Sequence, residues 1–196
     1  MAYLYHGTHT GGIKVLEPRS ILHGTNESVV YLTGNRVYGL FYIWDREHTM
    51  GPAYITAGIV KGRVIYEEQF PNQLECFYKG VSGWLYTVAQ SAEYLPVQNR
   101  EDMFYSSLPV AVEKAELVED VYSALTACET AGTLQVRRYL EQPVQRQQAL
   151  TDKADQRFCR GSGAAGVYDA VVPACLDAGA GIIKERKGYG IQDRYL

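Results

Sequence analysis

Between residues 53 and 118 the chain is a succession of short apolar segments, rich in β-branched and aromatic residues and separated by turns. Such segments are typical of strands. We expect strands at 53–60, 63–67, 83–89, 102–106 and 110–118, the first two joined as a hairpin by Lys61-Gly62, and a short helical turn at 74–78. A doubly wound parallel sheet needs a helix between successive strands, so the pattern excludes that class. It predicts an α+β or mainly-β domain, and of these we expect the α+β class.

The first 44 residues add two strands and a helix. We expect strands at 2–6 and 29–33, with a surface loop at 19–28 placed to cover a pocket. The helix follows Thr33 or Asn35 as its cap, because apolar residues then recur at the spacing i, i+3, i+4, i+7. They are Val37, Leu40, Phe41 and Trp44.

Both N-terminal strands end in residues suited to a flat, polar ligand. His6 offers a directional ring nitrogen, Gly7 lets a ligand approach the main chain, and Thr8 carries a hydroxyl. Tyr31 and Tyr42 are placed to sandwich an aromatic ring. Plainer roles stay open: His6 satisfied by a backbone carbonyl, Thr8 as a turn or cap residue, and the tyrosines as core.

These residues together resemble the ADP-ribosyltransferase superfamily, in its diphtheria-toxin and poly(ADP-ribose)-polymerase branch. That branch combines a histidine motif, two tyrosines separated by ten residues, and a glutamate that opens a late strand. Tyr31 and Tyr42 have ten residues between them. The resemblance covers residues 3–118 and implies a split antiparallel sheet with NAD as substrate.

Carried over by position, the resemblance implies that His6 bonds a ribose hydroxyl of NAD. It implies that the backbone of Gly7 and the hydroxyl of Thr8 hold the nicotinamide amide, and that Tyr31 and Tyr42 stack on the ring.

The implied catalytic glutamate is Glu101, at the junction of the 90–100 loop and the next strand. Glu93 and Asp102 are the competing acids. A carboxylate beside the ribose suits this chemistry, because breaking the bond to nicotinamide builds positive charge on the sugar. Asn99 falls where some relatives carry a glutamine or glutamate that selects the acceptor, so the acceptor stays open among proteins, nucleic acids and small molecules.

Charge and cysteine content narrow the remaining classes. A net charge of −3 does not favour a nucleic-acid acceptor held by charge. The cysteines Cys76, Cys128, Cys159 and Cys175 form no C-x-x-C pair, and no histidine pair has metalloprotease spacing, so we expect no metal site. No signal or membrane segment is evident, and we expect a cytoplasmic protein.

Residues 119–196 change character and carry no motif of known chemistry. A helix is expected from Glu119 to Thr130, and we divide the chain into a domain at 1–118 and a helical extension at 119–196, a candidate surface for a protein partner. Three alternatives to an active transferase stay open: an inactive NAD- or ADP-ribose-binding module, an RNA 2′-phosphotransferase using Arg19 or Arg36, and an interaction protein with a tyrosine-rich face.

Overall fold

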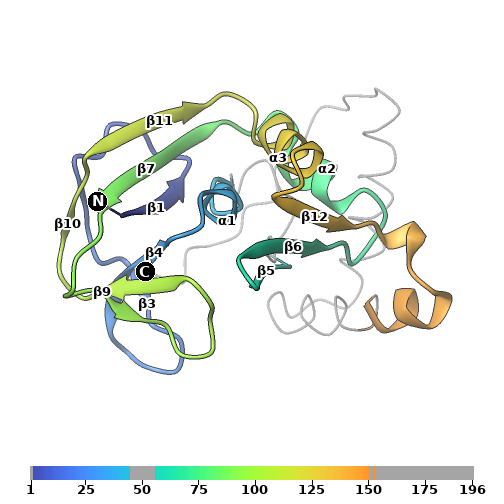
Figure 1. Cartoon of the computed structure of the whole chain (residues 1–196), viewed down its shortest axis with the longest axis horizontal. Coiled ribbons are helices and arrows are strands. Elements are labelled where there is room, and N and C mark those ends of the chain that lie inside the picture. The colour runs from blue at the N-terminus through green and yellow to red at the C-terminus, as the bar shows by residue number, and fades with distance from the viewer. Residues whose placement is uncertain (1, 45–55, 151, 153–196) are drawn as a thin grey trace, which may run out of the picture.

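A computed structural model describes residues 2–44, 56–150 and 152 of the chain (Figure 1). Its main sheet has the strand order β11-β7-β1-β4-β9-β8, with β3 added beside β4, and its neighbouring strands are antiparallel. These strands are β1 (Tyr3–Thr8), β3 (Ser20–Ile21), β4 (Ser28–Thr33), β7 (Gly83–Ala89), β8 (Leu95–Pro96), β9 (Met103–Ser106) and β11 (Lys114–Val118).

Two smaller sheets and short helices complete the described structure. The second sheet has the order β12-β6-β5, from β5 (Ala57–Val60), β6 (Arg63–Glu67) and β12 (Leu134–Arg137), and β2 (Val15–Leu16) pairs with β10 (Val110–Ala111). The helices are α1 (Arg36–Leu40), α2 (Gln73–Tyr78), α3 (Val121–Thr130) and a 3-10 turn at Tyr139–Glu141. The α+β class is therefore confirmed.

Helix α1 lies between the main sheet and the β12-β6-β5 sheet (Figure 1). Asn35 caps it, since its side chain accepts a hydrogen bond from the Tyr38 amide. The helix is shorter than predicted: after Leu40 the backbone bonds tighten to the i→i+3 type, with Ile43 N–H donating to Leu40 C=O at 3.0 Å. The expected stripe up to Trp44 therefore does not continue as one regular helix.

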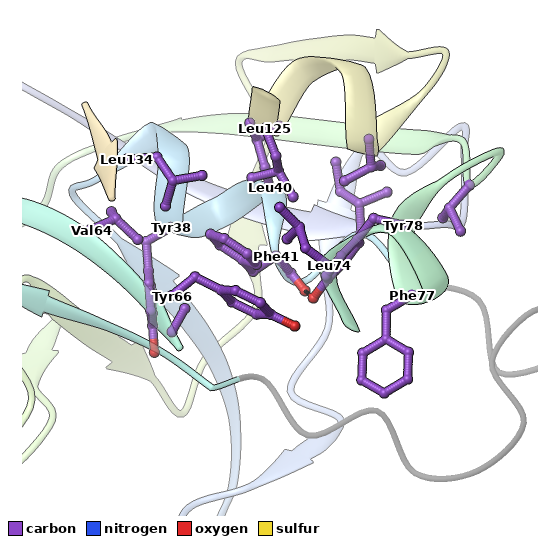
Figure 2. Packing of buried hydrophobic residues seen from close by; sticks show 14 of the residues in the cluster. Tyr38, Leu40, Phe41, Val64, Tyr66, Leu74, Phe77, Tyr78, Leu125 and Leu134 are labelled. Atoms are coloured by element: carbon purple, nitrogen blue, oxygen red, sulfur yellow. Dashed lines mark hydrogen bonds between the residues drawn. The ribbon is translucent and has the colours of Figure 1, made fainter. Parts of the chain in front are cut away.

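The largest apolar cluster surrounds the end of α1 (Figure 2). Phe41 is fully buried and stacks on Tyr66 with ring centroids 5.1 Å apart, while Tyr78 meets it edge-on at 5.6 Å. The Tyr78 hydroxyl donates to the Phe41 carbonyl at 2.9 Å, which satisfies a backbone group left open by the short helix. This cluster fixes α1 against both sheets.

Several predicted strands and the predicted hairpin are confirmed. The observed strands differ from the predicted ones where the chain changes from one pairing strand to another. β7 matches 83–89, and β5 and β6 form the hairpin over its described part; residues 53–55 lie outside the described residues. The strand expected at 110–118 is two strands, because residues 110–111 pair with β2 whereas 114–118 pair with β7. The loops predicted at 19–28 and 90–100 each contain a two-residue strand, β3 and β8.

The described part of the 119–196 region contains the predicted helix as α3, and its Leu125 belongs to the main apolar cluster. It also contains β12, which pairs in parallel with β6, so a purely helical character for this part was wrong. Leu134 is buried and Val136 half-buried beside β6, and such apolar residues suit a strand packed on one face. Residues 151 and 153–196 lie outside the described residues.

Candidate functional site

The central pair of strands, β1 and β4, separates soon after it forms. β1 pairs with β7 along Tyr3–Thr8, but within the described structure its register with β4 is limited to Tyr5 opposite Thr33. The His6 ring spans the opening, with Nδ1 2.8 Å from the Tyr31 carbonyl oxygen. A side chain thus takes the place of a strand-to-strand backbone bond, and an opening is left between the two strands.

A pocket of about 340 Å³ fills this opening. It is lined by all five residues predicted to hold the ligand: His6, Gly7, Thr8, Tyr31 and Tyr42. They come from β1, from β4 and from the turn after α1, which are up to 36 positions apart in the chain. The structure therefore brings the predicted ligand-binding residues together.

The close approach of α1 to β1 shapes the pocket floor. A Cβ atom placed on Gly7 would lie 2.1 Å from the Gly39 carbonyl oxygen, which is far inside contact distance. Gly39 itself lines the pocket. The glycine at position 7 therefore serves the packing of α1 as well as the access of a ligand.

The hydrogen bond of His6 determines what its ring offers to a ligand. A carbonyl oxygen can only accept, so Nδ1 carries the proton and donates to Tyr31. Burial lowers the pKa of His6, and the bond to the Tyr31 carbonyl offsets part of that effect. The neutral ring then presents Nε2 as an acceptor. Nδ1 is thus satisfied by a backbone carbonyl, as the simpler structural role for His6 predicted, while Nε2 can still accept a hydrogen bond from a ligand.

The lowered pKa of His6 predicts a pH-dependent stability. Below the ordinary histidine pKa of about 6.5, the unfolded chain binds a proton that folded His6 resists, so the free energy of unfolding falls as pH drops through the folded-state pKa. We expect the stability difference between wild type and His6→Gln to shrink in acid when measured by chemical denaturation. His9→Gln, at an exposed position, is the matched control. A His6 difference that is constant with pH would contradict the assignment.

The hydroxyls of Tyr31 and Tyr42 both form hydrogen bonds, but to different parts of the structure. The Tyr31 hydroxyl accepts from the His23 amide at 3.1 Å and donates to the Ile21 carbonyl at 3.3 Å, which ties the 19–28 segment to the pocket. The Tyr42 hydroxyl donates to that of Tyr38 at 3.3 Å, and burial raises the pKa of Tyr42. These hydrogen bonds hold both phenol rings in fixed orientations.

A second hollow of about 670 Å³ adjoins the first and shares Tyr31, Tyr42 and Met103 with it. Asn99 and Arg100 are also among its lining residues. No aspartate or glutamate is among the described residues that line either hollow. The joined space suits a neutral or anionic ligand longer than one ring.

The three candidate acids lie elsewhere. Glu101 accepts hydrogen bonds from the backbone amides of Lys61, at 3.0 Å, and Gly62, at 2.7 Å, so its carboxylate caps the β5–β6 turn. The carboxylate of Asp102 packs beside Gly34, and Glu93 is exposed. Asp102 has a positive φ of 59°, which breaks the extended backbone between Glu101 and the pocket residue Met103.

Sequence reasoning missed Ser20, Gly39, Trp44 and Met103, which also line the first pocket. Met103 was hidden inside an apolar strand pattern, and Ser20 inside a predicted loop. Arg19 and Arg36, considered for phosphotransfer, are not among the described residues around His6. The described residues contain no group of three or more side chains able to hold a metal ion.

In the described part of the chain, no helix is long and apolar enough to cross a membrane. Comparison with family models, with curated proteins and with solved structures finds no match.

Proposed function

We propose that this chain is a NAD-dependent ADP-ribosyltransferase. The observation that carries the proposal is the convergence of His6, Gly7, Thr8, Tyr31 and Tyr42 on one pocket in the opening between β1 and β4. These five positions were selected from sequence, and the resemblance assigns all of them to NAD. Their convergence supports the proposal beyond the spacing of the residues in the chain.

The chemistry of the pocket fits the nicotinamide end of NAD. Nε2 of neutral His6 accepts a hydrogen bond from a ribose hydroxyl, and the two phenol rings flank a planar base. The Thr8 hydroxyl already accepts the Thr10 amide at 3.2 Å, which leaves its own proton for an amide oxygen. The adjoining hollow accommodates the remainder of a dinucleotide or an acceptor.

In the proposed reaction, the bond from ribose C1′ to the nicotinamide nitrogen breaks, and nicotinamide keeps the electron pair and leaves neutral. No acid is needed for its departure. Positive charge builds on the ribose, where the Glu101 carboxylate stabilises it. An acceptor oxygen or nitrogen then bonds to C1′ and gives up a proton. The acceptor is a protein, a nucleic acid or a small molecule.

A local change of backbone conformation would bring Glu101 into this role. It lies two residues before Met103, and residues two apart in an extended strand face the same side. An extended backbone at Asp102, in place of its present positive φ, would turn Glu101 towards the pocket. The active form of the site therefore requires the carboxylate to leave the β5–β6 turn.

The position of Glu101 also favours a second candidate, a module that binds NAD or ADP-ribose without turnover. With the carboxylate on the turn, the pocket has ligand-holding groups but no acid among its described residues. Such a protein would bind NAD without releasing nicotinamide.

Binding is tested by titrating NAD into the wild type, Tyr31→Ala and Tyr31→Phe by calorimetry. We expect alanine to weaken binding by about 5- to 150-fold, because stacking on an aromatic side chain is worth about 1–3 kcal/mol. Phenylalanine keeps the ring and should keep most of the affinity. The control is Tyr3→Ala, because Tyr3 is 44% exposed and does not line the pocket. Equal affinities for the wild type and Tyr31→Ala would refute this site.

A further inference from the structure

A third hollow lies next to the first pocket, and Tyr5 lines both. It has a volume of about 530 Å³ and is bounded by the start of α1, the β5–β6 turn and the turn between α3 and β12. Its charged residues are Arg36, Lys61 and Arg63, and no acid is among the described residues that line it. The charged side chains that line the hollow are therefore all basic, and two carboxylates adjoin them: Glu116 on Arg36, and Glu101 on the turn amides.

Part of this positive charge has no partner. Arg36 pairs with Glu116, but in the described structure neither Lys61 nor Arg63 takes part in an ion pair. Both residues are exposed: Lys61 is the first residue of the two-residue turn, and Arg63 directly follows the turn. Unpaired cations that converge on one turn attract a ligand with more than one negative charge.

The turn itself already holds an anion from the protein. The Lys61 and Gly62 amides both point at the Glu101 carboxylate, one to each oxygen. Their backbone has positive φ at both residues, 51° and 76°, which lets successive amides face one group. The Asn35 side chain donates to the Gly62 carbonyl at 3.1 Å and holds the turn in place. The carboxylate shows that the turn accepts an oxyanion.

We propose that this hollow is a phosphate-binding site, in which a phosphate group replaces the Glu101 carboxylate on the Lys61 and Gly62 amides and pairs with Lys61 and Arg63. A phosphate presents the same type of oxygen acceptor as the carboxylate and carries more charge, which the two unpaired cations favour. Phosphate binding and Glu101 docking are mutually exclusive on the same two amides.

This exchange has a consequence that rests on the proposed function. A bound phosphate would release Glu101 from the turn and make it available to the neighbouring pocket. Loading of the basic hollow would then activate the transferase.

The test uses inorganic pyrophosphate as the probe, titrated into the full chain by calorimetry at constant ionic strength. The double variant Lys61→Ser/Arg63→Ser should bind at least tenfold more weakly than wild type. Glu101→Ala should bind more tightly, because the internal competitor is gone. Lys14→Ser/Lys114→Ser removes two exposed lysines outside the hollow and should match wild type.

Weaker pyrophosphate binding in the Lys61→Ser/Arg63→Ser variant and tighter binding in Glu101→Ala, with no change in the Lys14→Ser/Lys114→Ser control, would distinguish a specific site from general electrostatic attraction. Equal pyrophosphate affinity in wild type, Lys61→Ser/Arg63→Ser and Glu101→Ala would overturn the proposal, as would no binding by wild type. Titration with NAD identifies the source of the phosphate: a parallel loss in the cation variant assigns it to NAD, and an unchanged NAD affinity assigns it to another phosphorylated ligand. Pyrophosphate binding is read without NAD, so failure of the proposed function would not mask it.

Discussion

Glu101→Ala is expected to lower the rate of nicotinamide release from NAD by about 100- to 1,000-fold, the usual cost of removing one group that stabilises charge in a transition state. NAD affinity should persist, because Glu101 does not line the pocket that contains His6 and the tyrosines. The measurement is nicotinamide release by purified protein under saturating NAD, with calorimetry to confirm binding.

Loss of the turn cap is the main competing explanation for such a result. Gly62→Ala is the matched control: its φ of 76° disfavours alanine, while nothing lies within 4 Å of the added Cβ, so it strains the turn and spares the carboxylate. A similar loss of rate in Gly62→Ala would indicate a structural role for Glu101.

The competing acids are tested in the same assay with Glu93→Ala and Asp102→Asn. Full activity in Glu101→Ala would remove Glu101 from the mechanism, and loss in one of the other two variants would identify the acid. NAD binding by wild type without any nicotinamide release would instead support the binding module.

Gly7→Ala is expected to destabilise the fold by about 3 kcal/mol or more, at or beyond the upper end of the range for overpacked side chains. The added Cβ would lie 2.1 Å from the Gly39 carbonyl oxygen and 3.1 Å from Ile43 Cγ1. The first of these atoms belongs to the backbone of α1, which cannot rotate away as a side chain can. Strand β1 and helix α1 must therefore separate, and urea denaturation would measure the cost.

Gly58→Ala is the control for this substitution. Gly58 lies in β5, and no heavy atom is within 4 Å of an added Cβ. Its free energy of unfolding should stay within about 1 kcal/mol of wild type. Wild-type stability in Gly7→Ala would show that α1 does not rest on β1 as closely as the structure indicates.

Local sequence patterns predicted the elements whose conformation is set mainly by the backbone preferences of their own residues. The Lys61-Gly62 turn predicted the β5–β6 hairpin, because both residues adopt the positive φ that such a turn requires. The two-residue strands β3 and β8 escaped prediction, since their pairing depends on neighbours rather than on their own composition.

The sequence by itself determined the α+β class and five of the residues that line the first pocket, because strand periodicity and strand-end chemistry are local properties. Tertiary structure alone decided that β1 and β4 part after Tyr5, and that Glu101 caps a turn 40 positions earlier in the chain instead of facing the pocket. It also decided that β12 pairs in parallel with β6. Each of these depends on hydrogen bonds between groups that are far apart in the chain. The local residue pattern does not encode which distant groups form those bonds.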